Sequence, residues 1–253
     1  MQYTLKKSLG QHFLKDGQIC LKIYDAIKSE KPAQLLEIGP GAGALTKHLL
    51  QMEDVNFKAV ELDDEKVAYL LHTYPSIKDK LIHADFLKLS PPFENEFMVA
   101  GNFPYNISSQ ILFKVLEWKQ QVPTLVGMFQ KEVAMRIAAK PGNKVYGILS
   151  VLVQAFYETE YLFDVPPSCF TPPPKVMSGV IKLKRRNTVP AMRSEKDFFI
   201  LVKTAFNQRR KTMRNATRQL FTEEILKKEI FDKRAEQLTI DNFAALSFEI
   251  KNT

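Results

Sequence analysis

Between residues 19 and 130, short apolar runs alternate with longer amphipathic segments. This alternation is typical of βαβ units, which build a mostly parallel sheet covered by helices. We expect strands at residues 34–38, 57–62, 80–83, 97–100 and 124–129. Helices are expected at residues 19–28, 44–51, 64–72, 108–118, 131–139 and 146–154. The first part of the chain is therefore predicted to be an α/β, Rossmann-like domain.

The pattern changes toward the C-terminus. Strands expected at residues 157–164 and 179–184 lack a clear crossover helix, which indicates an antiparallel hairpin at the sheet edge and seven strands in all. Beyond residues 187–190 every pattern is helical, with helices expected at 195–207, 210–220, 223–231 and 241–249. We therefore predict two domains, residues 1–186 and a small all-α domain of residues 187–253. The second is too short to be stable alone and should dock on the first.

A glycine-rich turn follows the first strand of the sheet. Gly39 and Gly41 come directly after the apolar run 34–38 and before a helical pattern, where glycine lets the backbone approach a ligand closely. The spacing Gly39-x-Gly41-x-x-Ala44 also loosely satisfies a dinucleotide fingerprint. A nucleotide-type cofactor and a glycine turn without a ligand both remain open at this point.

Two acidic residues stand where later strands end. Glu61 closes its strand 20 residues after Gly41, a position from which a carboxylate can accept hydrogen bonds from ribose hydroxyls. Asp85 ends the next strand and could accept a hydrogen bond from an adenine amine, although a carboxylate there also suits a helix cap. Together with the glycines, these acids predict a cofactor site at the carboxyl edge of the sheet.

The sequence Asn102-Phe103-Pro104-Tyr105 follows the strand expected at 97–100. It resembles the signature of methyltransferases that act on amino groups, Asp/Asn-x-Pro-aromatic. An adenine amine is a poor nucleophile, but it becomes more tetrahedral if the Asn102 oxygen and a carbonyl of Phe103 or Pro104 accept its two hydrogens. Proline fixes such a loop, and Tyr105 offers a ring on which an extruded base can stack. An Asx-turn with a core tyrosine is the structural alternative.

Four segments, in this order, are similar to the ribosomal RNA adenine dimethyltransferase family: residues 7–14 (KSLGQHFL), 37–41 (EIGPG), 102–108 (NFPYNIS) and 165–176 (VPPSCFTPPPKV). The similarity is strongest to the bacterial small-subunit branch of that family. It implies a class I methyltransferase fold, with S-adenosylmethionine as cofactor, S-adenosylhomocysteine as product and no metal. It also implies dimethylation of the N6 amines of two adjacent adenines near the 3′ end of 16S ribosomal RNA in an immature small subunit.

The resemblance assigns roles residue by residue. The cofactor pocket would contain His12, Leu14, Gly39, Gly41, Glu61, Asp85 and Asn102. The catalytic and target-base pocket would contain Asn102, Pro104, Tyr105 and Phe170. The prolines around Phe170 make that segment stiff enough to hold its ring over the pocket, although a buried apolar plug is the alternative. Lys175, near the same segment, could meet a phosphate or face water.

Three positions depart from the residues that are usual in the family. His12 stands in place of Asn, so a hydrogen bond to the cofactor carboxylate is expected to be made differently or to depend on pH. Phe103 stands in place of Leu, and Met177 in place of Asp, which puts one salt link or loop contact in doubt. None of the three provides the side-chain acceptor proposed for the amine.

The net charge is +8, and the basic residues cluster late in the chain. Residues 203–218 include six basic side chains and no acid, namely Lys203, Arg209, Arg210, Lys211, Arg214 and Arg218. A further basic group precedes them, namely Lys182, Lys184, Arg185 and Arg186. Charge alone leaves a polyanion partner and a solvated basic helix face equally open. The resemblance favours 16S ribosomal RNA as the partner.

The two cysteines, Cys20 and Cys169, lie far apart and outside any zinc-type spacing, so we expect reduced thiols and no metal site. No apolar stretch reaches the ~18 residues of a membrane span, and residues 1–7 lack a signal-peptide core. We therefore expect a cytoplasmic monomer without a membrane partner. Three other functions remain open: an NAD-type oxidoreductase, a non-catalytic RNA-binding assembly factor, and the antibiotic-resistance branch that methylates 23S ribosomal RNA.

Overall fold

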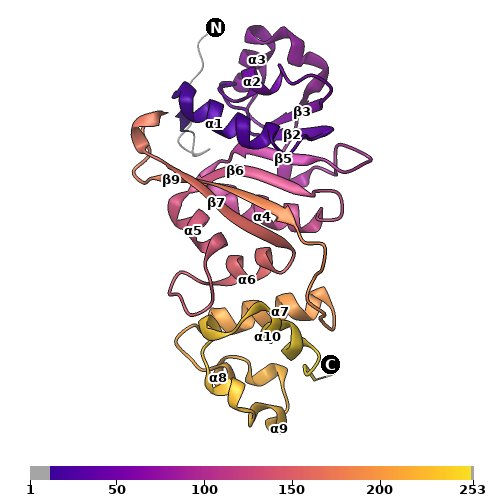
Figure 1. Ribbon diagram of the computed structural model, residues 1–253, viewed down its shortest axis with the longest axis vertical. Helices are drawn as coiled ribbons and strands as arrows, with labels where there is room; N and C mark the ends of the chain where they lie inside the picture. Colours follow the sequence, from indigo (N-terminus) through magenta and orange to yellow (C-terminus); the bar gives the residue numbers. More distant parts are fainter. Residues whose placement is uncertain (1–11, 252–253) are drawn as a thin grey trace. The chain divides into compact units, whose positions relative to one another are not determined.

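The computed structural model describes residues 12–251, and the chain divides into two compact units (Figure 1). The first unit comprises the chain up to Ala134 together with Thr159–Arg185. The second comprises Met135–Glu158 and everything from Arg186 onward. The second unit thus takes in residues 135–158 besides the expected C-terminal domain. The sequence-based expectations for residues 1–7 and for the family-like segment up to Gln11 lie outside the described residues.

The seven-stranded, mostly parallel sheet is confirmed, in the order β4-β3-β2-β5-β6-β9-β7. Its strands are β2 (Gln34–Ile38), β3 (Asn56–Glu61), β4 (Leu81–His83), β5 (Met98–Asn102), β6 (Thr124–Gln130), β7 (Tyr157–Val165) and β9 (Ser178–Arg185). The first five strands of this order pair in parallel. Strand β9 pairs antiparallel to β6 and separates it from the edge strand β7. The late strands therefore close one side of the sheet, as expected.

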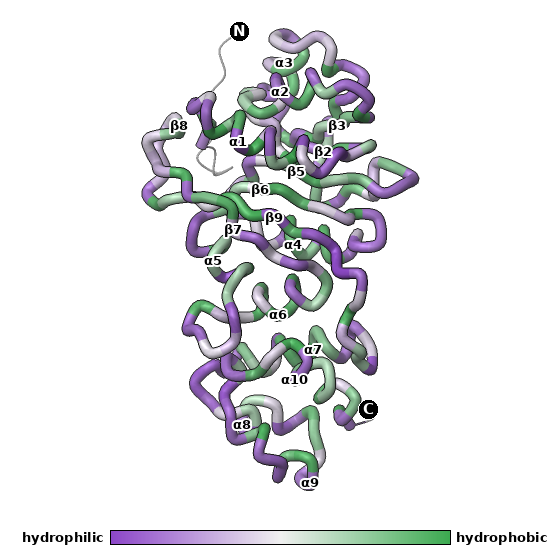
Figure 2. The backbone as a smooth tube through the Cα atoms, in the orientation of Figure 1, coloured by the Kyte–Doolittle hydropathy of each residue, from purple (hydrophilic) through white to green (hydrophobic). Residues whose placement is uncertain are grey.

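The strands are apolar because both faces of the sheet are covered. Residues 124–129 of β6 are all buried, and in Figure 2 the hydrophobic colour runs along this strand. Parallel strands that are buried on both sides are typically rich in Val, Ile and Leu without alternation, which is why the runs were visible in the sequence. No helix in residues 12–251 has the length and apolar character that crossing a membrane requires.

The helices of the first half begin and end close to their expected positions, with one exception. They are α1 (Gly17–Lys28), α2 (Thr46–Leu49), α3 (Asp64–Thr73), α4 (Ser108–Glu117), α5 (Lys131–Ala138) and α6 (Ile148–Gln154). The exception is α2, which has four residues where eight were expected. The positive φ of Gly43, 79°, keeps the preceding residues in turns, so the helix starts later than its apolar pattern suggested.

The C-terminal region is helical, but two of its helices are shorter than predicted. Its α-helices are α7 (Glu195–Asn207), α8 (Met213–Ala216), α9 (Glu223–Leu226) and α10 (Ile240–Ser247). Thr212 takes an extended N-cap conformation inside the helix expected at 210–220, so α8 starts only after it. Thr222 caps α9 where a helix was expected to begin, and the extended backbone of Lys228 keeps that helix from reaching residue 231. Short 3₁₀ turns fill the gaps, at Arg218–Leu220, Glu229–Asp232 and Ala235–Gln237.

A two-stranded antiparallel sheet was not predicted. Strand β1 (Phe13–Leu14) pairs with β8 (Phe170–Thr171), and Lys15 N donates to Cys169 O at 2.8 Å. Further 3₁₀ turns of the first unit are at Pro75–Lys80, Phe86–Lys88, Tyr105–Ile107 and Pro167–Cys169. Because β1 and β8 are each two residues long and their paired residues are 156 and 158 positions apart, no local pattern could reveal their pairing. The pairing joins the first described residues to the proline-rich segment.

Candidate active site

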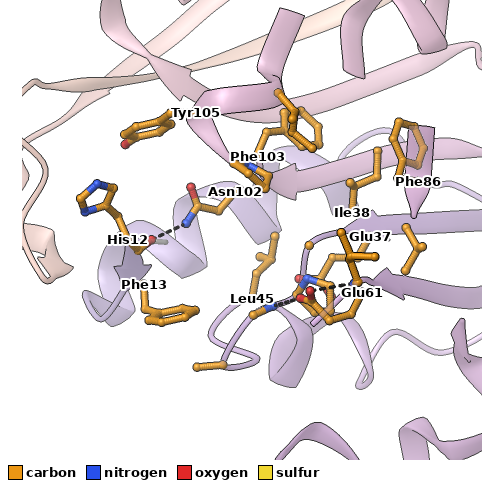
Figure 3. A pocket seen from close by; sticks show the side chains of 18 of the residues that line it. His12, Phe13, Glu37, Ile38, Leu45, Glu61, Phe86, Asn102, Phe103 and Tyr105 are labelled. Atoms are coloured by element: carbon orange, nitrogen blue, oxygen red, sulfur yellow. Dashed lines mark hydrogen bonds between the residues drawn. The ribbon is translucent and has the colours of Figure 1, made fainter. Parts of the chain in front are cut away.

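One cavity of about 320 Å³ lies at the carboxyl ends of β2, β3 and β5 (Figure 3). Parallel strands bring the residues that follow them to the same edge of a sheet, which is where ligands of such folds bind. The structure brings together at this cavity all of the residues expected to bind the cofactor, namely His12, Leu14, Gly39, Gly41, Glu61, Asp85 and Asn102. Pro104 and Tyr105 also line it. Their functional roles remain predictions.

The glycine loop lines part of the cavity. Gly39 and Gly41 have φ values of 67° and 57°, in the left-handed region that favours glycine. A Cβ atom on Gly41 would lie 2.8 Å from Cε1 of Phe13, which is closer than side-chain carbons pack. Glycine at this position therefore makes room both for the turn and for the ring of β1 that lies against it.

Glu61 is held rigidly at the cavity wall. Its Oε2 accepts a hydrogen bond from Gly41 N at 3.1 Å, and its Oε1 accepts from Leu62 N at 2.9 Å and Asp63 N at 3.0 Å. The carboxylate thus ties the glycine loop to the end of β3. A carboxylate oxygen can accept more than one hydrogen bond, so this anchoring still permits contacts to ligand hydroxyls.

Of the two roles that the sequence left open for Asp85, the structure shows the cap, and the role at the cofactor stays a prediction. Its Oδ1 accepts from Leu87 N at 3.0 Å and caps the turn Phe86–Lys88, so the capping alternative is observed. The residue nevertheless lines the cavity, and its Oδ2 lies 3.9 Å from Lys88 Nζ. The cap fixes one oxygen and leaves the other for a ligand donor.

Glu37, near the end of β2, was not predicted as a site residue. Its side chain lines the cavity and is buried, and among the described residues its Oε2 has no hydrogen-bond partner. The pKa of this carboxyl is raised to about 8, mainly by burial and to a smaller extent by the charge of Glu61, whereas the Thr46 hydroxyl opposes the shift. An acidic residue inside an apolar strand was the signal that could have revealed it.

The side chain of Asn102 has a defined orientation (Figure 3). Its Nδ2 donates to the main-chain oxygen of His12 at 3.2 Å. Because the amide nitrogen is used in this way, Oδ1 is the atom left to accept a hydrogen bond from a ligand. The next residues also have main-chain anchors: Phe103 N donates to Met128 O, and Ile107 N donates to Pro104 O, both at 3.2 Å.

Phe103, the departure from leucine, fills space that a glycine leaves open. Its ring is 1% exposed and lies 5.0 Å from the ring of Phe129, centroid to centroid. A Cβ on Gly127 of β6 would lie 2.1 Å from Cε2 of this ring. The absence of a side chain at Gly127, on the neighbouring strand β6, therefore makes room for the larger ring of Phe103. The ring packs below the main chain of its own loop, residues 102–105.

Tyr105 is fixed by two side chains. Its hydroxyl forms a hydrogen bond with Ser178 Oγ, and its ring stacks on that of His12, with centroids 5.6 Å apart and planes 30° apart. Burial raises the pKa of the Tyr105 phenol, which keeps it neutral, and the bond to Ser178 opposes part of the shift. The proposed stacking residue thus has a fixed ring.

The structure does not bring Phe170 to the cavity. The ring is 1% exposed, belongs to the hydrophobic core beside Leu14 and Val165, and is not among the residues that line the cavity. This is the placement expected of an apolar plug. Stacking on a base would require the ring to leave the core, so the role predicted for Phe170 has no support from its position.

The structure also shows the surroundings of the cysteines, of Met177 and of Lys175. Cys20 and Cys169 are buried free thiols. Met177 makes its loop contact through the main chain, since its oxygen accepts from Lys131 N at 2.9 Å. Lys175 is exposed. In the part of the chain that is described, no three His, Cys, Asp or Glu side chains are grouped to hold a metal ion, and the expectation of no metal stays a prediction.

Most of the basic residues singled out from the sequence have acidic or carbonyl partners within their own unit. Arg209 contacts Glu236 at 3.0 Å and the Lys144 carbonyl, Arg214 contacts Asp232 at 2.8 Å, and Arg218 lies 3.8 Å from Glu223. In the first unit, Lys182, Lys184 and Arg185 pair with Glu30, Glu160 or Glu96. By contrast, Arg210 and Lys211 are exposed, and no ion pair joins them to the described residues. The cluster available to a polyanion is therefore smaller than the sequence suggested.

Residues 2–251 match the protein family described as "Ribosomal RNA adenine dimethylase". Two proteins named "Ribosomal RNA small subunit methyltransferase A", from Cytophaga hutchinsonii and Flavobacterium johnsoniae, are each 53% identical to the chain; the alignments cover 96% and 97% of it and 95% of each relative. A dimethyladenosine transferase from Plasmodium falciparum superposes with a TM-score of 0.79 at 25% identity, over 94% of this chain and 97% of that one. The 23S rRNA methyltransferase ErmE superposes with a TM-score of 0.70 at 24% identity, over 92% and 99%.

Proposed function

The chain belongs to the ribosomal RNA adenine dimethylase family, and we propose that it dimethylates the N6 amines of two adjacent adenines near the 3′ end of 16S ribosomal RNA in the immature small subunit. Relatives that share half of its residues over nearly their whole length carry the name of a small-subunit methyltransferase. The observation that carries the chemistry is the amide of Asn102. Its nitrogen is engaged by the His12 carbonyl, so its oxygen is presented as an acceptor at the cavity.

The cavity suits S-adenosylmethionine as methyl donor. Its volume of about 320 Å³ falls within the range of small-molecule sites. The glycine turn lets the backbone approach a ligand, and the buried Glu37 carboxyl, whose Oε2 has no partner among the described residues, offers a hydrogen-bonding group to the ligand. Glu61 would accept from the ribose hydroxyls and Asp85 from the adenine amine, as the resemblance implies. A reaction that leaves S-adenosylhomocysteine as product follows from this donor.

The chain's own residues would act mainly by positioning. When bound, S-adenosylmethionine supplies an electrophilic methyl group on a sulfonium sulfur. Asn102 Oδ1 and a main-chain carbonyl of Phe103 or Pro104 accept the two hydrogens of the target amine, so its lone pair is directed toward that methyl group. These acceptors also stabilise the positive charge that develops on the nitrogen. No strong base is needed, because the amine becomes acidic once it is methylated and cationic.

The target base would stack on Tyr105, which holds its ring at the cavity edge. Stacking of a base on an aromatic side chain is worth about 1–3 kcal/mol and is how enzymes retain an extruded base. The exposed Arg210 and Lys211 of the second unit would contact phosphates of the RNA, a salt-sensitive interaction. We also retain the proposals of a monomer and of a cytoplasmic location.

The three other functions that the sequence left open are supported less well. Family membership argues against an NAD-type oxidoreductase, and the presented amide at Asn102 argues against an assembly factor that has lost its chemistry. Methylation of 23S ribosomal RNA is the nearest rival, but the likeness to ErmE concerns the fold only, whereas the 53% identical relatives are named for the small subunit.

The test is transfer of radiolabelled methyl groups to unmodified ribosomal subunits. Purified protein is incubated with labelled S-adenosylmethionine and either small or large subunits. We expect label in the small subunit, and nucleoside analysis should show that N6,N6-dimethyladenosine carries it. Label only in the large subunit would support the rival, and label in neither would refute the proposed activity.

A further inference from the structure

Tyr105 owes its position to two side chains that lie far from it in the sequence and that no motif assigned to this task. Ser178 begins β9, 73 residues later in the chain, and its hydroxyl meets that of Tyr105. His12 stacks on the ring. In Figure 3 the rings of His12 and Tyr105 lie on the same side of Asn102, away from Glu37 and Glu61. The imidazole thus lies beside the Tyr105 ring rather than beside the two carboxylates.

Ser178 is itself rigidly placed. It is 0% exposed and stands opposite Gln130 in the antiparallel pairing of β6 and β9. The residue that follows β6 also anchors this end, because Lys131 N donates to Met177 O. Leaving a buried hydroxyl without a hydrogen-bond partner costs about 1–3 kcal/mol, so the contact between the serine hydroxyl and the phenol is favoured.

His12 is held in place by a hydrogen bond to the proline-rich segment. Its Nδ1 lies 2.9 Å from Pro172 O, and because a carbonyl can only accept, Nδ1 carries the hydrogen of this bond. The same residue's main-chain oxygen accepts from Asn102 Nδ2. One residue therefore connects the proline-rich segment, the stacking ring and the catalytic amide.

We propose that Ser178 and His12 are positioning residues that hold the Tyr105 ring for the target base. This inference rests on the proposed function, since it concerns how the base is received. It differs from the expectation for His12, which the sequence placed with the cofactor.

The pair Ser178→Ala and Tyr105→Phe tests the serine, because each variant removes the same hydrogen bond from one end. We expect each to lower the maximal rate of methyl transfer to small subunits by about 3- to 10-fold, the equivalent of one hydrogen bond. The double variant should be no slower than either single variant. Affinity for S-adenosylmethionine, measured by calorimetry, should be unchanged in all three.

A spectroscopic readout separates positioning from general stability. In protein labelled with ring-¹³C tyrosine, the resonance of Tyr105 is identified by its absence from Tyr105→Phe. It should shift in Ser178→Ala and in His12→Asn, but not in Thr124→Val. This control removes a buried hydroxyl at the opposite end of the same strand pair, where Thr124 faces Lys184.

The outcomes are distinct. An unshifted Tyr105 resonance together with a normal rate in Ser178→Ala would overturn the inference, and so would effects of the two single variants that multiply in the double variant. If Ser178→Ala fails to fold, Tyr105→Phe is judged by the same rate criterion. If the unaltered protein transfers no methyl group to small subunits, the proposed function fails, whereas the resonance still decides whether these two residues hold the ring.

Discussion

Gly127→Ala should destabilise the protein through a single contact. The added methyl would lie 2.1, 2.8 and 2.9 Å from three carbons of the Phe103 ring, well inside normal packing distance. Phe103 is 1% exposed, so its ring cannot move into solvent without disturbing the core. Overpacking of this kind costs about 1–3 kcal/mol, and the severity of the clash places it near the upper end. Replacing glycine in a strand returns about 0.5–1 kcal/mol, so we expect a net loss of about 2 kcal/mol.

The matched variant is Phe103→Leu, which restores the residue usual in the family. Alone it should cost about 1 kcal/mol, because it leaves unfilled volume beside Gly127. Combined with Gly127→Ala, the smaller side chain makes room for the new methyl. The double variant should therefore be within about 1 kcal/mol of the unaltered protein, a favourable coupling of about 2 kcal/mol between the two positions.

Urea unfolding of the four proteins at one pH measures these differences directly. We expect the rate of methyl transfer to fall in the same variants that lose stability. Phe103 lies between Asn102 and Pro104, and a shift of about 1 Å in positioned groups can slow a reaction by up to about 10²-fold. Additive losses of stability in the double variant would refute the reasoning. They would mean that Phe103 and Gly127 do not share one space.

Two further predictions concern charge. Glu37→Gln should flatten the dependence of stability on pH. The folded protein holds the Glu37 proton up to a pKa of about 8, whereas the unfolded chain releases it near 4.5. The stability of the unaltered protein therefore falls by up to about 1.4 kcal/mol per pH unit between these two values. Urea unfolding at several pH values checks this, and parallel curves for the two proteins would contradict it. Replacing Arg210 and Lys211 by Ala should weaken binding to small subunits and lower the salt slope of log K by about 1–2, with cofactor affinity unchanged. Arg209→Ala is the contrasting variant: it should mainly destabilise the second unit, because Arg209 bonds Glu236 and the Lys144 carbonyl. Equal salt slopes for the unaltered protein and the Arg210/Lys211 variant would refute the phosphate contacts.

The sequence predicted those features that depend on local pattern. Apolar strands separated by amphipathic helices gave the sheet, and polar residues at strand ends gave the cavity, because parallel strands bring Gly39, Glu61, Asp85 and Asn102 to one edge. The short lengths of α2, α8 and α9 were missed, because the turn at Gly43, the cap at Thr212 and the extended backbone at Lys228 outweighed the helical periodicity.

Features that depend on long-range contact were not predictable. The pairing of β1 with β8, the Ser178 hydroxyl at Tyr105 and the Gly127 space beneath Phe103 join residues that are far apart in the chain. Similarly, the run of basic residues looked unpaired because its acidic partners, such as Asp232 and Glu236, come later in the sequence. The resemblance placed Phe170 at the target pocket, whereas its burial in the core depends on packing against distant residues such as Leu14, which no local pattern reveals.

The most direct test is the single-turnover rate of methyl transfer to unmodified small subunits by Asn102→Ala at saturating S-adenosylmethionine. Loss of the acceptor oxygen should lower this rate by about 10²–10³-fold, as for removal of one preorganised polar contact elsewhere. Cofactor affinity, measured in parallel, should change by no more than about tenfold, since at most one hydrogen bond to the cofactor is lost. A variant that transfers methyl groups at the full rate would show that the Asn102 oxygen does not receive the amine.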